Sequence, residues 1–228
     1  MILKTNLKTA LMAATLAVFT VGAGVNAQSS SPADQTAPAA LAGLTIPDRE
    51  GVWGDIVYGS PDAPVELIEY ASLTCPHCAS FSRDVLPLLM KDFVNEGHVR
   101  FVFRNFVLNR LDLAAAATSR CLTSEDATKR TMAALFAEQS QWLQADNQLT
   151  AIMEIVGREG LNEEGVRECL ADQQVTKHIV EMMQQGAKDH DVQATPTLVL
   201  NGVSMSFPGY AALKLRIEAQ LGSDYLNK

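Results

Sequence analysis

Short apolar segments rich in β-branched and aromatic residues stand at both ends of the folded part of the chain. The strand candidates are residues 55–58, 65–71, 99–107, 197–200 and 203–207. Asn201-Gly202 joins the last two, and this dipeptide is the strongest short signal for a two-residue hairpin. Apolar residues at helical spacing predict a helix at residues 75–96, kinked at Pro87, and a final helix at residues 210–221.

The middle of the chain has a different pattern. From about residue 111 to residue 191 it is helix-like almost throughout, with breaks near residues 123–124, 146–147, 160 and 172. The expected order is therefore β-β-α-β, a block of helices, and then β-β-α. This order predicts an α/β fold in which the block at about 111–191 is inserted between a βαβ unit and a C-terminal ββα unit.

The first 27 residues have the three parts of a secretory signal peptide. Lys4 and Lys8 precede an apolar run at residues 10–21, and a small residue followed by Asn26-Ala27 offers a cleavage site after Ala27. A membrane anchor is disfavoured, because the run is shorter than the roughly 20 residues that span a bilayer. We expect an exported, periplasmic protein with a flexible tether at residues 28–51 and a folded domain at residues 52–228.

The composition agrees with an exported globular protein. Hydrophobic residues make up 47% of the chain, which argues against disorder. The 18 basic and 26 acidic residues give a formal net charge of −8, so the chain repels phosphate backbones and nucleic-acid binding is not expected. Export would place the four cysteines in an oxidising compartment, where disulfides persist.

The most informative motif is Cys75-Pro76-His77-Cys78, at the junction of a strand and a helix. Free backbone N–H groups and the positive end of the helix dipole would stabilise a thiolate at Cys75. Pro76 suits the first helical position, and a protonated His77 would add a neighbouring cation. Cys75 is thus the expected exposed nucleophile and Cys78 the buried resolving partner.

Other uses of this motif fit less well. A zinc site would need two more ligands at compatible spacing, and haem attachment would need histidine where Ala79 stands. An inert disulfide across four residues would add little stability through loop closure. A redox centre is therefore favoured, and no metal or cofactor is expected.

Two features outside the motif fit a redox centre. Glu69 and Glu66 lie an odd number of positions apart in one strand, so they point to opposite faces and cannot share one solvent-facing side. Glu69 is a candidate proton acceptor and donor for Cys78, although it could simply face solvent. Thr195-Pro196 precedes a strand, where a cis proline would present the backbone of Thr195 to a substrate, although an ordinary trans turn is the alternative.

Cys121 and Cys169 lie in the helical block, without a helix N-terminus or cation arranged to activate them. Spare cysteines in an exported protein usually pair, so we expect a structural disulfide between them. Two buried free thiols are the alternative.

The Cys-Pro-His-Cys motif, Glu69 six residues upstream, the helical block and Thr195-Pro196 before the hairpin together resemble the DsbA-like periplasmic thiol:disulfide oxidoreductases. The run at residues 104–108 is similar to the strand end that enters the helical insertion of that family. The resemblance covers about residue 52 to the C-terminus and implies a thioredoxin-like core. Thr195 is a departure, because the DsbA branch often has valine there and threonine also occurs in the isomerase branch.

The resemblance implies that the Cys75–Cys78 disulfide is donated to reduced secreted or periplasmic proteins. It also implies reoxidation by a quinone-linked membrane partner of the DsbB type. A disulfide isomerase or reductase is the first alternative, and a non-catalytic periplasmic binding protein or holdase is the second. The isomerase branch has an N-terminal dimerisation domain for which residues 28–51 are too short, so a monomer is expected.

Overall fold

The computed structural model describes residues 54–222 and 225. The expected signal peptide, the tether and the first residues of the expected domain lie outside the described residues, so these assignments stay predictions. None of the described helices combines the length and the apolar character that crossing a bilayer requires.

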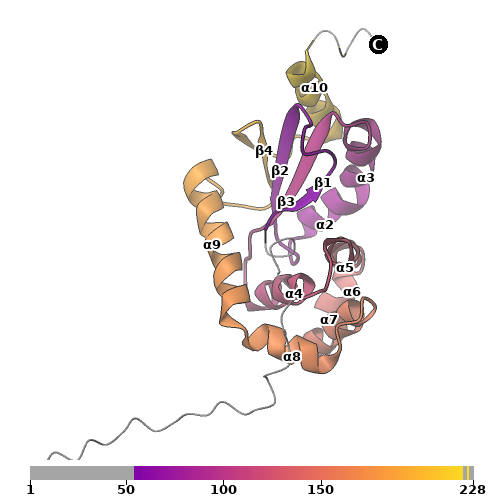
Figure 1. Ribbon diagram of the computed structural model, residues 1–228, viewed down its shortest axis with the longest axis vertical. Coiled ribbons are helices and arrows are strands. Elements are labelled where there is room, and N and C mark those ends of the chain that lie inside the picture. The colour runs from indigo at the N-terminus through magenta and orange to yellow at the C-terminus, as the bar shows by residue number, and fades with distance from the viewer. Residues whose placement is uncertain (1–53, 223–224, 226–228) are drawn as a thin grey trace, which may run out of the picture. The chain divides into compact units, whose positions relative to one another are not determined.

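Five strands form one mixed sheet in the order β1-β3-β2-β4-β5 (Figure 1). They are β1 (Ile56–Tyr58), β2 (Val65–Ala71), β3 (Val99–Asn105), β4 (Thr197–Leu200) and β5 (Val203–Ser206). The central pair β2 and β3 runs parallel, and the other neighbours run antiparallel. The βαβ unit and the ββα unit are both present, so the predicted α/β fold is confirmed.

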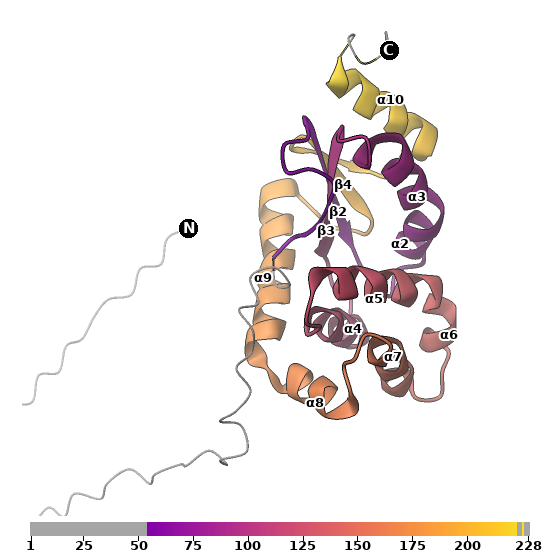
Figure 2. The same ribbon diagram turned by 45° about the vertical axis from the view of Figure 1, so that its right-hand side comes forward.

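Helices cover both faces of the sheet, as Figure 2 shows. The helix that begins at Pro76 and α10 (Tyr210–Leu221) pack on one face, where they enclose the main core with side chains such as Leu67. The long helix α9 (Gln173–His190) lies along the other face, over a smaller cluster that includes Tyr70. The strands of the middle of the sheet are therefore buried on both faces, which explains their nearly continuous apolar sequence.

The helix after β2 is irregular. It consists of α2 (Pro76–Ser80), the π-helical η2 (Phe81–Val85), α3 (Leu86–Leu89) and the π-helical η3 (Met90–Val94). Pro87 has no N–H to donate to the preceding turn, and the irregularity expected there takes the form of the π-helical turns on either side of α3. The helix ends two residues earlier than the pattern predicted.

The inserted block is helical, as predicted. Its helices are α4 (Arg110–Arg120), α5 (Glu125–Ala137), α6 (Gln139–Leu143), α7 (Gln148–Gly157), α8 (Glu163–Ala171) and α9. Polar side chains that accept a hydrogen bond from the first turn begin most of them, namely Asn109, Ser124, Asn147, Asn162 and Asp172. One break was not expected: Glu138 leaves the helical conformation between α5 and α6 without a glycine, a proline or a capping signal nearby.

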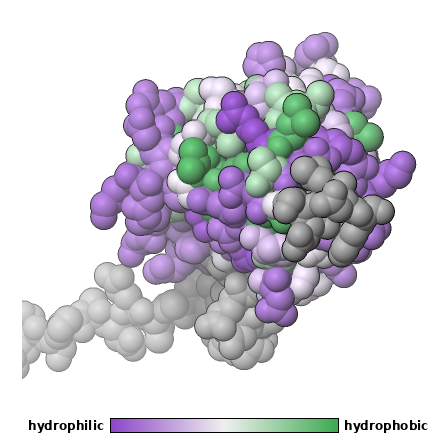
Figure 3. Space-filling model, turned by 90° about the horizontal axis from the view of Figure 1, so that it is seen from above, coloured by the Kyte–Doolittle hydropathy of each residue, from purple (hydrophilic) through white to green (hydrophobic). Residues whose placement is uncertain are grey.

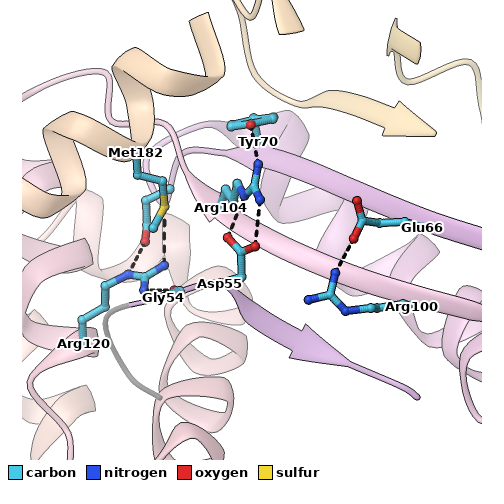
Figure 4. A network of polar contacts seen from close by, with 9 residues as sticks. Gly54, Asp55, Glu66, Tyr70, Arg100, Arg104, Arg120 and Met182 are labelled. Carbon is cyan, nitrogen blue, oxygen red and sulfur yellow. Dashed lines mark hydrogen bonds and ion pairs between the residues drawn. The ribbon is translucent and has the colours of Figure 1, made fainter. Parts of the chain in front are cut away.

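A fully buried arginine ties the insertion to the sheet (Figure 4). Arg120, at the end of α4, donates from Nε to Asn105 Oδ1 at 2.7 Å and from Nη1 to the Gly54 carbonyl at 2.7 Å. Its Nη2 lies 3.8 Å from Met182 Sδ in α9. β3 ends at Asn105, opposite Ala71, the last residue of β2, rather than at residue 107 as the pattern predicted.

Cys121 and Cys169 form a disulfide in the structure, with their Cα atoms 6.0 Å apart. Cys121 follows the last turn of α4 and Cys169 lies in α8. The bond thus joins two helices of the insertion, and the alternative of two free thiols does not describe this pair.

Figure 3 looks onto the end of the domain that carries α10 and shows hydrophobic side chains gathered among hydrophilic ones. The most exposed large hydrophobic residues of the described chain are Leu215 of α10 and Val203 of β5, at 68% and 65%. The beginning of α2 lies away from this end, between the sheet and the insertion (Figure 1).

Candidate active site

Cys75 occupies the N-cap position of α2, directly after the short loop that leaves β2. Its backbone is extended, with φ −84° and ψ 121°, and Pro76 takes the first helical position, where no N–H is needed. Cys78 lies one turn later and is fully buried. Both cysteines are free thiols in the structure. Only 7% of Cys75 is exposed, less than the sequence led us to expect for a nucleophile.

The surroundings of Cys75 favour its thiolate. A hydrogen bond from the Cys78 thiol is the largest cause that lowers the pKa of Cys75 to about 5, and burial opposes it. Thr195 and the backbone N–H groups of Cys78 and His77 lower the pKa further. These N–H groups belong to the first turn of α2, which has no preceding carbonyls to bond. Cys75 is therefore mainly a thiolate at neutral pH.

Thr195, in the loop before β4, contacts the Cys75 sulfur. The Thr195-Pro196 peptide is cis, and Cys75 Sγ lies 3.4 Å from the Thr195 carbonyl oxygen. The Thr195 carbonyl can accept a hydrogen bond from the protonated Cys75 thiol. The Thr195 hydroxyl is buried and has no hydrogen-bond partner among the described residues, so it can donate to the thiolate instead.

The surroundings of Cys78 and Glu69 favour their protonated forms. The hydrogen bond with Cys75 raises the pKa of Cys78 far above its ordinary value, and burial and the charge of Glu69 raise it further. Glu69 is 2% exposed, and burial is the main cause that raises its own pKa, followed by the charge of Cys75. Glu66, three positions earlier, instead forms an ion pair with Arg100 at the surface. The structure thus separates the two glutamates as their spacing predicted.

The motif's middle residues face outward. The side chains of Pro76 and His77 are both exposed. Among the contacts that lower the Cys75 pKa, His77 contributes through its backbone N–H. The tuning role of the His77 imidazole stays a prediction.

Two residues that sequence reasoning missed hold the loop before Cys75. Gln139 Nε2 donates to the carbonyls of Leu73 and Cys75, at 2.8 and 3.0 Å, from the start of α6. Asp112 Oδ1 accepts the Leu73 N–H at 2.8 Å from the first turn of α4. An acid in the first turn after an Asn cap is a recognisable helix start, but nothing local to Gln139 indicates its contact. The insertion therefore positions the motif as well as covering it.

Titration of the reduced protein tests this site. We expect the ultraviolet absorbance of the Cys75 thiolate to appear with a midpoint near pH 5 rather than at the ordinary 9.0. Folding lowers this pKa, so ionisation of Cys75 contributes its full stabilisation to the reduced fold above about pH 9. This contribution declines as the pH falls and is lost below about pH 5. Cys75→Ser, which has no thiolate at this position, should lack the transition. A midpoint near 9 in the native protein would contradict the assignment.

The sequence of this chain matches a family model and several named relatives. A family model described as Thioredoxin matches residues 52–219. Disulfide bond formation protein D of Bacillus subtilis is 28% identical over 190 residues, which cover 77% of this chain and 81% of that protein. A relative from Rickettsia conorii with the provisional name protein-disulfide oxidoreductase is 27% identical over 149 residues, or 65% of this chain. The chain spans only 54% of that relative's length.

Solved structures agree on the fold. The crystal structure of alpha-DsbA1 from Wolbachia pipientis superposes with a TM-score of 0.69 at 25% identity, covering 76% of this chain and 94% of that one. Oxidised BdbD from Bacillus subtilis gives a TM-score of 0.64 at 26% identity, covering 75% and 94%. The predicted thioredoxin-like core with a helical insertion is confirmed.

Proposed function

This chain belongs to the thioredoxin family, and on that premise we propose that it is a protein-disulfide oxidoreductase that donates the Cys75–Cys78 disulfide to reduced substrate proteins. One observation carries the proposal. Cys75 lies at a helix N-cap where its thiolate is stabilised, in hydrogen-bond contact with a buried second cysteine. A cysteine of this kind accepts nucleophilic attack in the disulfide and leaves readily as a thiolate.

The reaction begins with the oxidised enzyme. A substrate thiolate attacks Cys75 Sγ, the Cys75–Cys78 bond breaks, and the electron pair of that bond leaves on Cys78. Glu69 gives its proton to the Cys78 sulfur. The products of this step are a mixed disulfide between substrate and Cys75, a Cys78 thiol and a Glu69 carboxylate.

A second substrate thiolate completes the reaction. It attacks the substrate sulfur of the mixed disulfide, and Cys75 leaves as its thiolate. The substrate has lost two electrons and gained a disulfide, and the enzyme has gained the same two electrons. Since a thiol of low pKa is a good leaving group and its thiolate stabilises the reduced enzyme, the transfer favours oxidation of the substrate.

The loop before β4 forms part of the substrate site in this proposal. The Thr195 carbonyl lies beside the Cys75 sulfur, where an extended substrate could pair with the backbone of Thr195 and Pro196. The relatives named for disulfide bond formation and for protein-disulfide oxidoreductase activity support the same class of reaction.

The cellular setting is also a proposal. Cleavage after Ala27 would release a periplasmic monomer whose substrates are reduced secreted or periplasmic proteins. A quinone-linked membrane protein of the DsbB type would reoxidise Cys75 and Cys78. This setting rests on the N-terminal sequence pattern and on the family resemblance.

Oxidative folding of a model protein tests the function. We expect the oxidised enzyme to introduce disulfides into a fully reduced substrate in the absence of other oxidants, one disulfide per enzyme molecule. Rescue of a scrambled substrate without net oxidation would instead identify an isomerase. Suppression of aggregation without any thiol exchange would identify a holdase and overturn the proposal.

A further inference from the structure

Gln139 is a buried polar side chain that reaches the redox motif from the insertion. It is the first residue of α6, and only 6% of it is exposed. Its Nε2 atom donates one hydrogen bond to the Leu73 carbonyl at 2.8 Å and one to the Cys75 carbonyl at 3.0 Å. A side-chain amide nitrogen has two hydrogens, so both are committed to the segment that ends at Cys75.

The Cys75–Pro76 peptide has a single hydrogen-bonding group, because Pro76 has no backbone N–H. That group is the Cys75 carbonyl, which accepts from the Ala79 N–H at 3.1 Å as well as from Gln139. Ala79 lies in the same helix as Pro76, so its bond orients the peptide relative to that helix alone. Gln139 belongs to the insertion, and its bond fixes the peptide relative to a second part of the fold.

The residues just before Cys75 are held by the same donor. The Leu73 carbonyl accepts from Gln139, and the Thr74 N–H donates to Ser72 Oγ at 3.1 Å, so both polar groups of the Leu73–Thr74 peptide have partners. The Cys75 N–H closes this turn by donating to the Ser72 carbonyl at 3.2 Å. Because the backbone of a residue sets the direction of its side chain, these contacts determine where the Cys75 sulfur points.

The helix junction that carries Gln139 is itself braced. α5 packs against α2, and α6 continues from the end of α5 (Figure 2). Arg83 Nη1 of η2 donates to the Phe136 carbonyl at 3.3 Å, three residues before Gln139. Trp142 is 1% exposed, and its Nε1 donates to the Leu135 carbonyl at 2.7 Å. Gln139 thus extends from a packed junction that also contacts the redox helix.

We propose that Gln139 is a positioning residue of the redox centre: its two hydrogen bonds direct the Cys75 sulfur toward the free N–H groups of the first turn of α2 and make the Cys75–Cys78 disulfide a stronger oxidant. The inference rests on the proposed function, because it concerns the same thiol and the same two-electron reaction. Asp112 also holds this loop, through the Leu73 N–H rather than through Cys75. Gln139 acts through the backbone of Cys75.

The direction of the sulfur affects the stability of the reduced enzyme. The backbone N–H groups of His77 and Cys78 stabilise the Cys75 thiolate and lower its pKa. A sulfur displaced from these groups is a less stable thiolate, so the disulfide accepts two electrons from a dithiol less readily. Only the two cysteines and the dithiol change oxidation state, and Gln139 neither gains nor loses a proton.

Gln139→Met tests the inference, with Gln141→Met as the matched control. Methionine is close to glutamine in length but has no donor, so the Leu73 and Cys75 carbonyls lose this partner. Gln141 lies in the same short helix, and its side chain is exposed. The measurements are ultraviolet titration of the reduced proteins and their equilibration with glutathione buffers at neutral pH.

We expect Gln139→Met to raise the midpoint of the Cys75 titration by about one pH unit, a tenfold loss of thiolate stabilisation. The equilibrium with glutathione should move about tenfold toward the oxidised enzyme, which corresponds to a reduction potential lower by about 30 mV. Gln141→Met should change neither quantity. An unmoved midpoint or an unmoved potential in a folded Gln139→Met protein would overturn the proposal.

Two further variants separate positioning from a general loss of stability. Trp142→Phe removes the bond to the Leu135 carbonyl, so it should lower the melting temperature but leave the Cys75 midpoint in place. If it moves the midpoint as far as Gln139→Met does, loosening of the insertion explains both shifts and the proposal fails. Gln139→Asn is one methylene shorter and serves where Gln139→Met does not fold. Its midpoint should also rise, and a native midpoint would contradict the proposal.

Neither readout requires the enzyme to oxidise a substrate protein. If the native protein does not oxidise a reduced substrate but the midpoint and potential of Gln139→Met move as expected, the proposed function fails and the positioning role stands. If the native protein oxidises substrates and Gln139→Met keeps the native potential, the proposed function stands and Gln139 has no positioning role.

Discussion

Cys75→Ala should reduce thiol oxidation to the uncatalysed rate, whereas Cys78→Ala should trap substrates as mixed disulfides. The two outcomes differ because only Cys75 meets the substrate. Its sulfur lies beside the Thr195 carbonyl and retains some exposure, while Cys78 is fully buried beneath it. In Cys78→Ala the Cys75 thiolate attacks a disulfide of an oxidised protein, and one sulfur of that disulfide leaves as a thiolate. No Cys78 is present to displace the protein from Cys75, so the mixed disulfide persists.

Non-reducing gels and mass spectrometry of reactions with a disulfide-containing protein would show the trapped species. A control variant at the other cysteine pair, Cys121→Ala with Cys169→Ala, should trap nothing, because that pair is bonded within the insertion. Mixed disulfides attached to Cys78 in the Cys75→Ala protein would reverse the assignment of roles.

The order of elements was predictable because each strand has a dense apolar pattern and a marked end. β2, β4 and α10 have the bounds that the pattern predicted, and Asn201-Gly202 forms the turn between β4 and β5. β3 ends at Asn105, opposite the last residue of β2, Ala71, and this pairing is not contained in the local sequence pattern. The Asn105 side chain also accepts a hydrogen bond from Arg120, a contact that forms only when the insertion folds back on the sheet.

The redox motif was predictable because its chemistry is local. Cys75, Pro76 and Cys78 share one helical turn, so their spacing already places the sulfur at the helix N-terminus. The groups that position this turn were not predictable. Gln139 reaches the Leu73 carbonyl across 66 positions of sequence, at a helix break without any breaker residue.

The buried Glu69 carboxyl was likewise predictable only in part. The pattern could mark Glu69 as costly, because a carboxyl in an apolar strand needs a use. It could not show that Glu69 lines a small cavity together with Tyr58, since this depends on how β1 pairs with β3. Long-range pairing, rather than residue type, completes the site.

Removing the disulfide of the insertion should destabilise the protein strongly while leaving its chemistry in place. The bond links Cys121 at the end of α4 to Cys169 in α8, across a sequence separation of 48. In the chain-entropy account a loop of this length contributes roughly 4 kcal/mol by restricting the unfolded chain. For a domain of this size, about 2–4 °C per kcal/mol implies a melting temperature lower by about 8–16 °C.

Cys121→Ala with Cys169→Ala is the appropriate variant, because a single replacement would leave a thiol free to exchange with Cys75. Calorimetry without reductant should show the lower melting temperature, and the native protein should approach it when fully reduced. α4 also carries Asp112, which holds the loop before Cys75, so a loosened insertion could slow oxidation near the melting temperature. Well below that temperature the rate should be that of the native protein. An unchanged melting temperature would show that the bond adds no stability, and lost oxidation in a folded variant would make the pair part of the redox chemistry.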